Sequence, residues 1–125
     1  MAKKILIVDD EKDIATSVKT LVDNLGYLGT IANDGKSALD ILKKDRFDLV
    51  LLDILMPKMS GREVLEKIRA DPKIKNQKVA FLSVVQLSPG GQSSVKKLKP
   101  VAYFQKPLTD LEDFRTKLKG ILSKG

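Results

Sequence analysis

Short apolar runs alternate along the chain with stretches in which apolar residues recur every three to four positions. The runs cover residues 4–8, 27–32, 48–53, 78–83 and 101–105. Runs of this length, rich in β-branched residues, are typical of strands buried on both faces, and the stretches between them predict helices. The expected fold is therefore α/β, a (βα)5 doubly wound sheet of five parallel strands of the flavodoxin-like type.

The boundaries of the helices are marked by residues that favour helix starts and stops. Ser60 is placed to cap the third helix and Thr109 the last one. Segment 87–99 begins with a Pro-Gly-Gly turn, so a helix is expected there only over Gln92–Leu98. Neither a repeat nor a linker is visible, so residues 1–125 are expected to form one domain without an output domain.

The composition excludes several kinds of chemistry. The chain has no cysteine and no histidine, which excludes disulfides, zinc sites and Ser-His-Asp catalysis. Any metal must be held by oxygen, which favours magnesium, calcium or manganese. No apolar run approaches the roughly 18 residues that a membrane helix needs. We therefore expect a cytoplasmic protein without a membrane partner.

The positive charge is unevenly distributed. The formal net charge is +7, and between Asp71 and Asp110 there are seven lysines and no carboxylate. This segment is either a solvated lysine-rich surface or a docking surface for an acidic partner. It contains no nucleic-acid motif, so direct binding to nucleic acid is not expected.

Polar side chains stand directly after the apolar strands. In open parallel sheets, ligands bind beyond the carboxyl ends of the strands. Any one of these acids could be a simple helix cap, but acids, a hydroxyl and a lysine together predict one shared site. Its members are Asp9 and Asp10 after the first strand, Asp53 after the third, Ser83 after the fourth and Lys106 after the fifth.

Adjacent carboxylates repel one another, and burial increases the repulsion. The sequence therefore predicts a divalent cation between them, and oxygen ligands suit Mg²⁺. Such an ion would attract a phosphoryl group, for which Asp53 is the natural nucleophile because it comes alone from its strand. Lys106 would pair with the phosphoryl charge, and the Ser83 hydroxyl would donate to a phosphoryl oxygen.

The motifs at these positions occur together in one known family. The chain resembles, over nearly its whole length, the response-regulator receiver domain of two-component signalling, in particular the stand-alone chemotaxis type. The resemblance implies the strand order 2-1-3-4-5. It rests on LIVDD at 6–10, DILMP at 53–57, Ser60-Gly61, LS at 82–83 and YFQKP at 103–107.

The resemblance also implies a function and the roles of site residues. Asp53 would accept a phosphoryl group from a histidine kinase, a phosphotransfer protein or a small phosphodonor, so the chain would not be an enzyme in the usual sense. Asp10, Asp53 and the main-chain carbonyl of Leu55 would bind Mg²⁺, and Asp9 would contact it through water.

The signalling parts of the family map onto the second half of the chain. Tyr103 would be the switch aromatic that follows Ser83, and Pro107 would follow a cis bond. The signal would leave through the face formed by helix 4, strand 5 and helix 5. Two departures occur: Val84 replaces the usual alanine, which predicts slow phosphoryl turnover, and Lys99-Pro100 replaces a frequent Gly-Ala, which favours a short fourth helix.

Three alternatives remain at this point. A flavin- or nucleotide-binding domain would need small residues, not Asp-Asp-Glu, after the first strand. A metal-dependent phosphohydrolase would need a further acid/base group near the leaving oxygen. A pseudo-receiver would keep the fold and bind a partner without being phosphorylated, and it is the strongest alternative.

Overall fold

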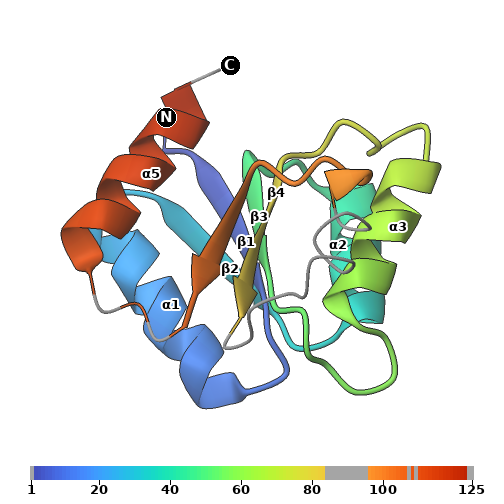
Figure 1. Ribbon diagram of the computed structural model, residues 1–125, viewed down its shortest axis with the longest axis horizontal. Coiled ribbons are helices and arrows are strands. Elements are labelled where there is room, and N and C mark those ends of the chain that lie inside the picture. The colour runs from blue at the N-terminus through green and yellow to red at the C-terminus, as the bar shows by residue number, and fades with distance from the viewer. Residues whose placement is uncertain (1, 84–95, 107, 109, 124–125) are drawn as a thin grey trace.

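A five-stranded parallel sheet forms the centre of the protein in the computed structural model, which describes residues 2–83, 96–106, 108 and 110–123 (Figure 1). The strands are hydrogen-bonded in the order β2-β1-β3-β4-β5. Both the predicted fold class and the predicted strand order are therefore confirmed. The strands are β1 (Lys4–Val8), β2 (Leu28–Ala32), β3 (Leu49–Leu52), β4 (Val79–Ser83) and β5 (Ala102–Gln105).

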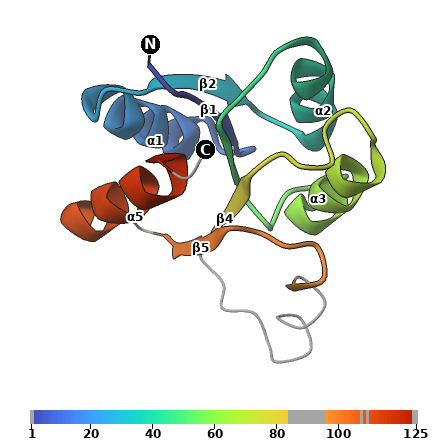
Figure 2. The ribbon, with the colours of Figure 1, turned by 90° about the horizontal axis from the view of Figure 1, so that it is seen from above.

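Helices cover both faces of the sheet. Helices α1 (Lys12–Asn24) and α5 (Leu111–Ser123) lie on one face, and α2 (Gly35–Lys44) and α3 (Gly61–Ala70) lie on the other (Figures 1 and 2). This arrangement is expected when each strand is joined to the next by a crossover of constant hand. No described helix is long and apolar enough to span a membrane.

The side chains of each strand alternate between two cores. In β1, Ile5 and Ile7 join the core beneath α1 and α5, whereas Leu6 and Val8 join the core beneath α2 and α3. All four are at most 1% exposed. Because both faces are covered, both sets of positions must be apolar, which explains the continuous apolar runs. Each fully buried side chain of this kind contributes about 1.5–3 kcal/mol.

The ends of the elements follow the sequence signals where the structure describes them. The Glu63 main-chain N–H donates to the Ser60 side chain at 3.2 Å, so the predicted cap of α3 is confirmed. Thr109 and most of the predicted helix Gln92–Leu98 lie outside the described residues. Just before β5, Lys99 has a positive φ of 54°.

Candidate functional site

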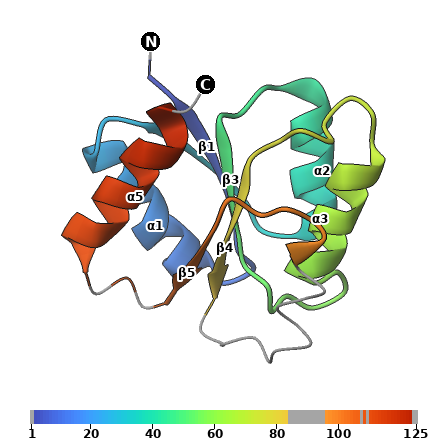
Figure 3. The ribbon, with the colours of Figure 1, turned by 45° about the horizontal axis from the view of Figure 1, so that its top comes forward.

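The carboxyl ends of β1 and β3 bring three acidic side chains together, at the lower edge of the sheet in Figure 3. Asp9 and Asp10 follow β1, Asp53 follows β3, and the two strands are paired. One carboxylate oxygen from each residue lies within 4.8 Å of the other two. The Asp53 main-chain N–H donates to the carbonyl of Val8 at 2.9 Å, so sheet pairing itself fixes this approach. The predicted convergence of the three acids is confirmed.

Lys106 reaches this cluster from the end of β5. Its Nζ lies 2.8 Å from Asp9 Oδ2 and 3.8 Å from Asp53 Oδ1, and the residue is only 8% exposed. Its main-chain N–H donates to the carbonyl of Ser83 at 2.8 Å, which ties it to β4. The sequence predicted only that Lys106 would pair with the charge of a phosphoryl group. In the structure it is a buried counter-ion of Asp9, which offsets part of the repulsion among the acids.

Asp9 is held by main-chain and side-chain donors. The Glu11 main-chain N–H donates to Asp9 Oδ1 at 3.0 Å, and Asn33 Nδ2 donates to the Asp9 carbonyl at 3.1 Å. Asn33 was not among the predicted site residues. The signal that could have found it is the Asn-Asp-Gly turn at the end of β2, because β2 pairs with β1 and therefore ends beside Asp9.

Asp53 is the most perturbed carboxyl of the cluster. Burial, which leaves it 5% exposed, is the main cause that raises the pKa of Asp53, and together with the charges of Asp9 and Asp10 it brings this pKa to about 6. Lys106 acts in the opposite direction, as does the Leu55 main-chain N–H, which donates to Asp53 Oδ1 at 3.3 Å. The pKa of Asp53 therefore lies only about one unit below neutral pH, and a shift of this kind is typical of functional sites.

Gly61 allows α3 to start directly against the site. A Cβ atom at this position would lie 2.1 Å from the carbonyl oxygen of Asp53 and 2.9 Å from Cα of Ile54. The Gly61 N–H instead donates to the Ile54 carbonyl at 2.9 Å. Only glycine permits this contact, so the pair Ser60-Gly61 both caps α3 and fixes the loop that follows Asp53.

Ser83 and Tyr103 connect the acidic cluster with β5. Ser83 is fully buried at the end of β4, and Tyr103 is half-buried on β5, opposite Phe81 in the register. The Phe81 and Tyr103 rings pack with their centroids 6.3 Å apart. Burial raises the pKa of Tyr103, whereas its side-chain hydrogen bond with Ser83 lowers it. Two other residues singled out in the sequence, Val84 and Pro107, lie outside the described residues.

The donor set of the cluster fits a hard divalent cation. Three carboxylates offer oxygen atoms at a spacing that one ion can bridge, and no imidazole or thiolate ligand is available because the chain lacks histidine and cysteine. Leu55, whose carbonyl was predicted as a further ligand, belongs to the loop that Asp53 begins.

A flavodoxin-like domain with such an acidic pocket at the carboxyl ends of its strands can hold a divalent cation and, through it, a phosphoryl group. Residues 5–119 match the model of the response regulator receiver domain. The chain therefore belongs to this family: it is a signalling module with a phosphoacceptor pocket, rather than a true enzyme, and receiver domains have histidine kinases as partners.

Known relatives agree with this assignment. The regulatory protein VanRc of Enterococcus gallinarum is 34% identical over 116 residues, which are 90% of this chain and 47% of VanRc. The chain thus spans about half the length of that relative. The chemotaxis protein CheY-3 of Vibrio cholerae is 39% identical over 85% of this chain and 82% of its own length. The crystal structure of a CheY-like receiver domain from Methanospirillum hungatei has a TM-score of 0.87 and 30% identity, and the match covers 98% of this chain and 95% of that one.

Proposed function

We propose that the chain is a phosphorylation-driven switch in which Asp53 accepts one phosphoryl group in a Mg²⁺-dependent reaction. The observation that carries this proposal is the position of the Asp53 carboxylate, buried between two further carboxylates and an ammonium group. A carboxylate nucleophile placed in this way has metal ligands and a cation for the phosphoryl charge within reach.

The transfer forms a bond between a carboxylate oxygen of Asp53 and phosphorus. The bond from phosphorus to the donor breaks, and the leaving group, a histidine nitrogen or an acyl oxygen, keeps its electron pair. With a pKa of about 6, Asp53 is mostly ionised at neutral pH, as a nucleophile must be. Mg²⁺, held by Asp10, Asp53 and the Leu55 carbonyl with Asp9 as an outer ligand, would neutralise phosphoryl oxygens.

The residues around Asp53 supply the response to phosphorylation. Lys106 Nζ lies 3.8 Å from Asp53 Oδ1 and can turn from Asp9 towards a phosphoryl oxygen. Ser83 donates to another such oxygen, and its hydrogen bond with Tyr103 carries the change to β5. The signal then reaches a partner protein through the face that contains β5 and α5; the predicted helix 4 part of this face lies outside the described residues.

A groove beside the site is suited to the phosphodonor protein. It has a volume of about 620 Å³ and lies between α1 and the start of α5. Its exposed surface is mainly apolar, although five of its ten lining residues, among them Lys106, are polar. Leu111 on its rim is 51% exposed. An apolar helix face of a histidine kinase or phosphotransfer protein would dock there. The proposed role is that of a cytoplasmic protein that acts together with its kinase.

Intact-mass spectrometry after incubation with Mg²⁺ and acetyl phosphate tests the proposal. We expect a mass increase of one phosphoryl group that is absent without Mg²⁺ and absent in Asp53→Asn. Asp48→Asn is the matched control, because Asp48 precedes the same strand that Asp53 follows. This variant should be phosphorylated like the natural protein. A folded protein that gains no mass under any condition would be a pseudo-receiver, and turnover of an added phosphoester would indicate a hydrolase.

A further inference from the structure

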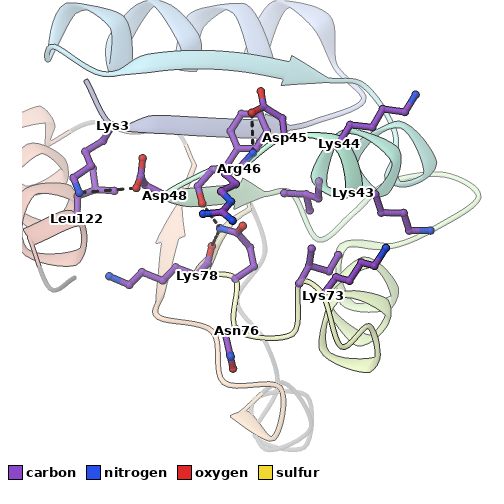
Figure 4. Close-up of a pocket in the computed structure, with 14 residues that line it drawn as sticks. Lys3, Lys43, Lys44, Asp45, Arg46, Asp48, Lys73, Asn76, Lys78 and Leu122 are labelled. Atoms are coloured by element: carbon purple, nitrogen blue, oxygen red, sulfur yellow. Dashed lines mark hydrogen bonds and ion pairs between the residues drawn. The ribbon is translucent and has the colours of Figure 1, made fainter. Parts of the chain in front are cut away.

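A second pocket lies at the opposite edge of the sheet, where β1, β3 and β4 begin. It has a volume of about 750 Å³ and is formed by the ends of α2 and α5 and by the segment between α3 and β4 (Figure 4). Its lining carries six cationic side chains and two carboxylates, which leaves a formal charge of +4 in one concavity. The cationic residues are Lys3, Lys43, Lys44, Arg46, Lys73 and Lys78.

The two carboxylates of this basic pocket are already engaged. Lys4, which lies outside the lining, binds Asp45 through Nζ at 2.5 Å and donates its main-chain N–H to Asp48 at 2.8 Å. Lys3 Nζ lies 3.9 Å from Asp48. The acids therefore do little to neutralise the other cations of the pocket.

Four cations of the basic pocket remain uncompensated. Lys43, Lys44, Arg46 and Lys73 form no ion pair with any residue that the structure describes. Lys43 and Lys44 belong to the last turn of α2, where cations favourably oppose the helix dipole. Arg46 and Lys73 lie outside any helix, so the dipole does not explain them. In Figure 4 the Lys43 and Lys73 amino groups end on the same side of the pocket, while Lys44 points away.

The wall that carries Lys73 is held in place by hydrogen bonds. Arg69 Nη1 donates to the carbonyls of Lys75 and Gln77 at 2.9 and 2.7 Å. Gln77 Nε2 in turn donates to the carbonyls of Phe47 and Lys78, both at 3.1 Å. These bonds tie the segment between α3 and β4 to the start of β3. A ligand that binds here would not have to order this wall first, which lowers the entropic cost of binding.

The chemistry of the pocket limits its ligand. Phe47, its aromatic residue, is only 8% exposed, and Lys4 Nζ lies 4.9 Å from the centre of its ring, so no ring face is open for stacking a base. Recognition would depend on charge. The volume lies within the range of about 300–1,000 Å³ that is usual for small-molecule sites, whereas nucleic acid is bound along extended phosphate-tracking surfaces.

We propose that the basic pocket binds a small phosphate-rich anion that carries at least three negative charges. This site goes beyond the proposed function, and it lies across the sheet from Asp53. Some of its cations belong to the lysine-rich segment between Asp71 and Asp110, and others lie at the end of α2. Part of the excess positive charge of the sequence therefore lines the basic pocket.

Calorimetric titration with tripolyphosphate tests this site. The buffer contains EDTA and no Mg²⁺, so that the acidic pocket repels the probe. We expect one molecule to bind per chain, and binding to weaken at least about tenfold, which is 1.4 kcal/mol, in the double variant Lys43→Ala/Lys73→Ala. The matched control is Lys36→Ala/Lys67→Ala, which removes the same charge from exposed positions of α2 and α3 outside the pocket. Binding to this control should change by less than about twofold, since distant exposed charges are screened by salt.

Several outcomes would overturn the proposal. Equal weakening in both double variants would indicate diffuse attraction to surface charge, and no binding by the natural protein at 150 mM salt would exclude the site. Tighter binding of hexaglutamate or of duplex DNA through the same lysines would assign the pocket to an acidic protein or to nucleic acid. Arg46→Gln, a single exposed change, provides a second test if the double variant fails to fold: it should also weaken binding of tripolyphosphate.

Discussion

The two edges of the sheet carry opposite charge, but only at one of them are the charged groups buried within the fold. At the carboxyl edge, Asp9 and Asp53 are at most 5% exposed and share the ammonium group of Lys106. At the amino edge, the basic pocket is open, and the side chains of Arg46 and Lys73 have no acidic partner among the described residues. Charge at the carboxyl edge is thus organised by the fold, whereas charge at the amino edge is available to a ligand.

Part of this polarity is a general consequence of a parallel α/β fold. Every helix begins near the carboxyl edge and ends near the amino edge, so helix dipoles favour acids at the first and cations at the second. This effect is worth only about 0.3–1 kcal/mol for each exposed charge. It does not explain why acids are buried at one edge, nor why cations outside the helices gather at the other. The following predictions separate these contributions.

The largest effect is expected from Gly61→Ala at the carboxyl edge. The new Cβ would overlap the Asp53 carbonyl, so α3 must move away from the site. We expect the free energy of unfolding, measured with urea, to fall by about 3 kcal/mol, and Mg²⁺ to raise the melting temperature less than in the natural protein. Gly120→Ala in α5 is the control: among the described residues, no atom outside its own helix backbone lies within 4 Å of the new Cβ, and alanine should stabilise the helix by about 0.5–1 kcal/mol. Similar stability losses in both variants would contradict this account.

Two Lys→Met substitutions compare the edges directly. Lys106→Met leaves the buried carboxylate of Asp9 without its counter-ion and should lower the free energy of unfolding by about 3 kcal/mol. Mg²⁺ should raise the free energy of unfolding of Lys106→Met more than that of the natural protein, because the ion would replace the missing cation. Lys4→Met removes the exposed ion pair with Asp45 and should cost at most about 1 kcal/mol. An equal loss of stability in both variants in metal-free buffer would contradict this account, because the buried ion pair would then matter no more than the exposed one.

The sequence was sufficient to predict most of the carboxyl edge. The continuous apolar strands predicted the parallel sheet. The acids that follow β1 and β3 predicted the cluster on the condition that these strands are paired, and that pairing was implied by the family resemblance. Lys106 Nζ lies 2.8 Å from Asp9 Oδ2 but 3.8 Å from Asp53 Oδ1. The spacing of residues along the chain does not encode a difference of this size. The support that Asn33 gives to Asp9 was also missed, although the Asn-Asp-Gly turn that ends β2 beside β1 could have indicated it.

The amino edge was much harder to predict. The sequence placed the excess charge in the segment between Asp71 and Asp110, but the basic pocket combines Lys73 of that segment with Lys43 and Arg46 of a charge-balanced region. Strands were recognised by their apolar residues, whereas the residues just before them form no motif. The concavity arises from the packing of helix ends, which only the three-dimensional structure reveals.

The pH dependence of stability should reveal the cost of burying an ionised Asp53 beside the other acids when no metal is bound. The pKa of Asp53 is about 6 in the folded protein and about 3.9 in an unfolded chain, so the folded state binds more protons between these values. Stability should therefore fall as the pH rises from 4 to 6, by about 2 kcal/mol. Asp53→Asn should lack this fall and be the more stable protein at pH 7 in EDTA.

Other carboxyl groups do not obscure this effect. Asp23, Asp34 and Asp45 have pKa values below their usual range, mainly because of hydrogen bonds, so the stability they provide is lost as the pH falls below about 5. This loss is common to the natural protein and Asp53→Asn, so the difference between the two proteins isolates Asp53. Urea unfolding of both proteins at intervals from pH 4 to 8 measures the difference. Mg²⁺ should raise the stability of the natural protein above pH 6 and that of Asp53→Asn much less. Parallel curves for the two proteins would show that Asp53 is not destabilising.

The smallest effect concerns the cost of placing lysine where the backbone favours glycine. Lys99 has a φ of 54°, and its carbonyl accepts a hydrogen bond from Arg69 Nη2 at 3.1 Å, which holds the chain before β5. Glycine would remove about 1–2 kcal/mol of backbone strain but would add entropy to the unfolded chain, so Lys99→Gly should stabilise the protein by about 0.5 kcal/mol. Lys97→Gly, two residues earlier and without a positive φ, should instead lose about 0.5–1 kcal/mol. A loss in both variants would mean that the Lys99 side chain provides stability of its own. A gain confined to Lys99→Gly would show that the fold does not require a lysine side chain at this position.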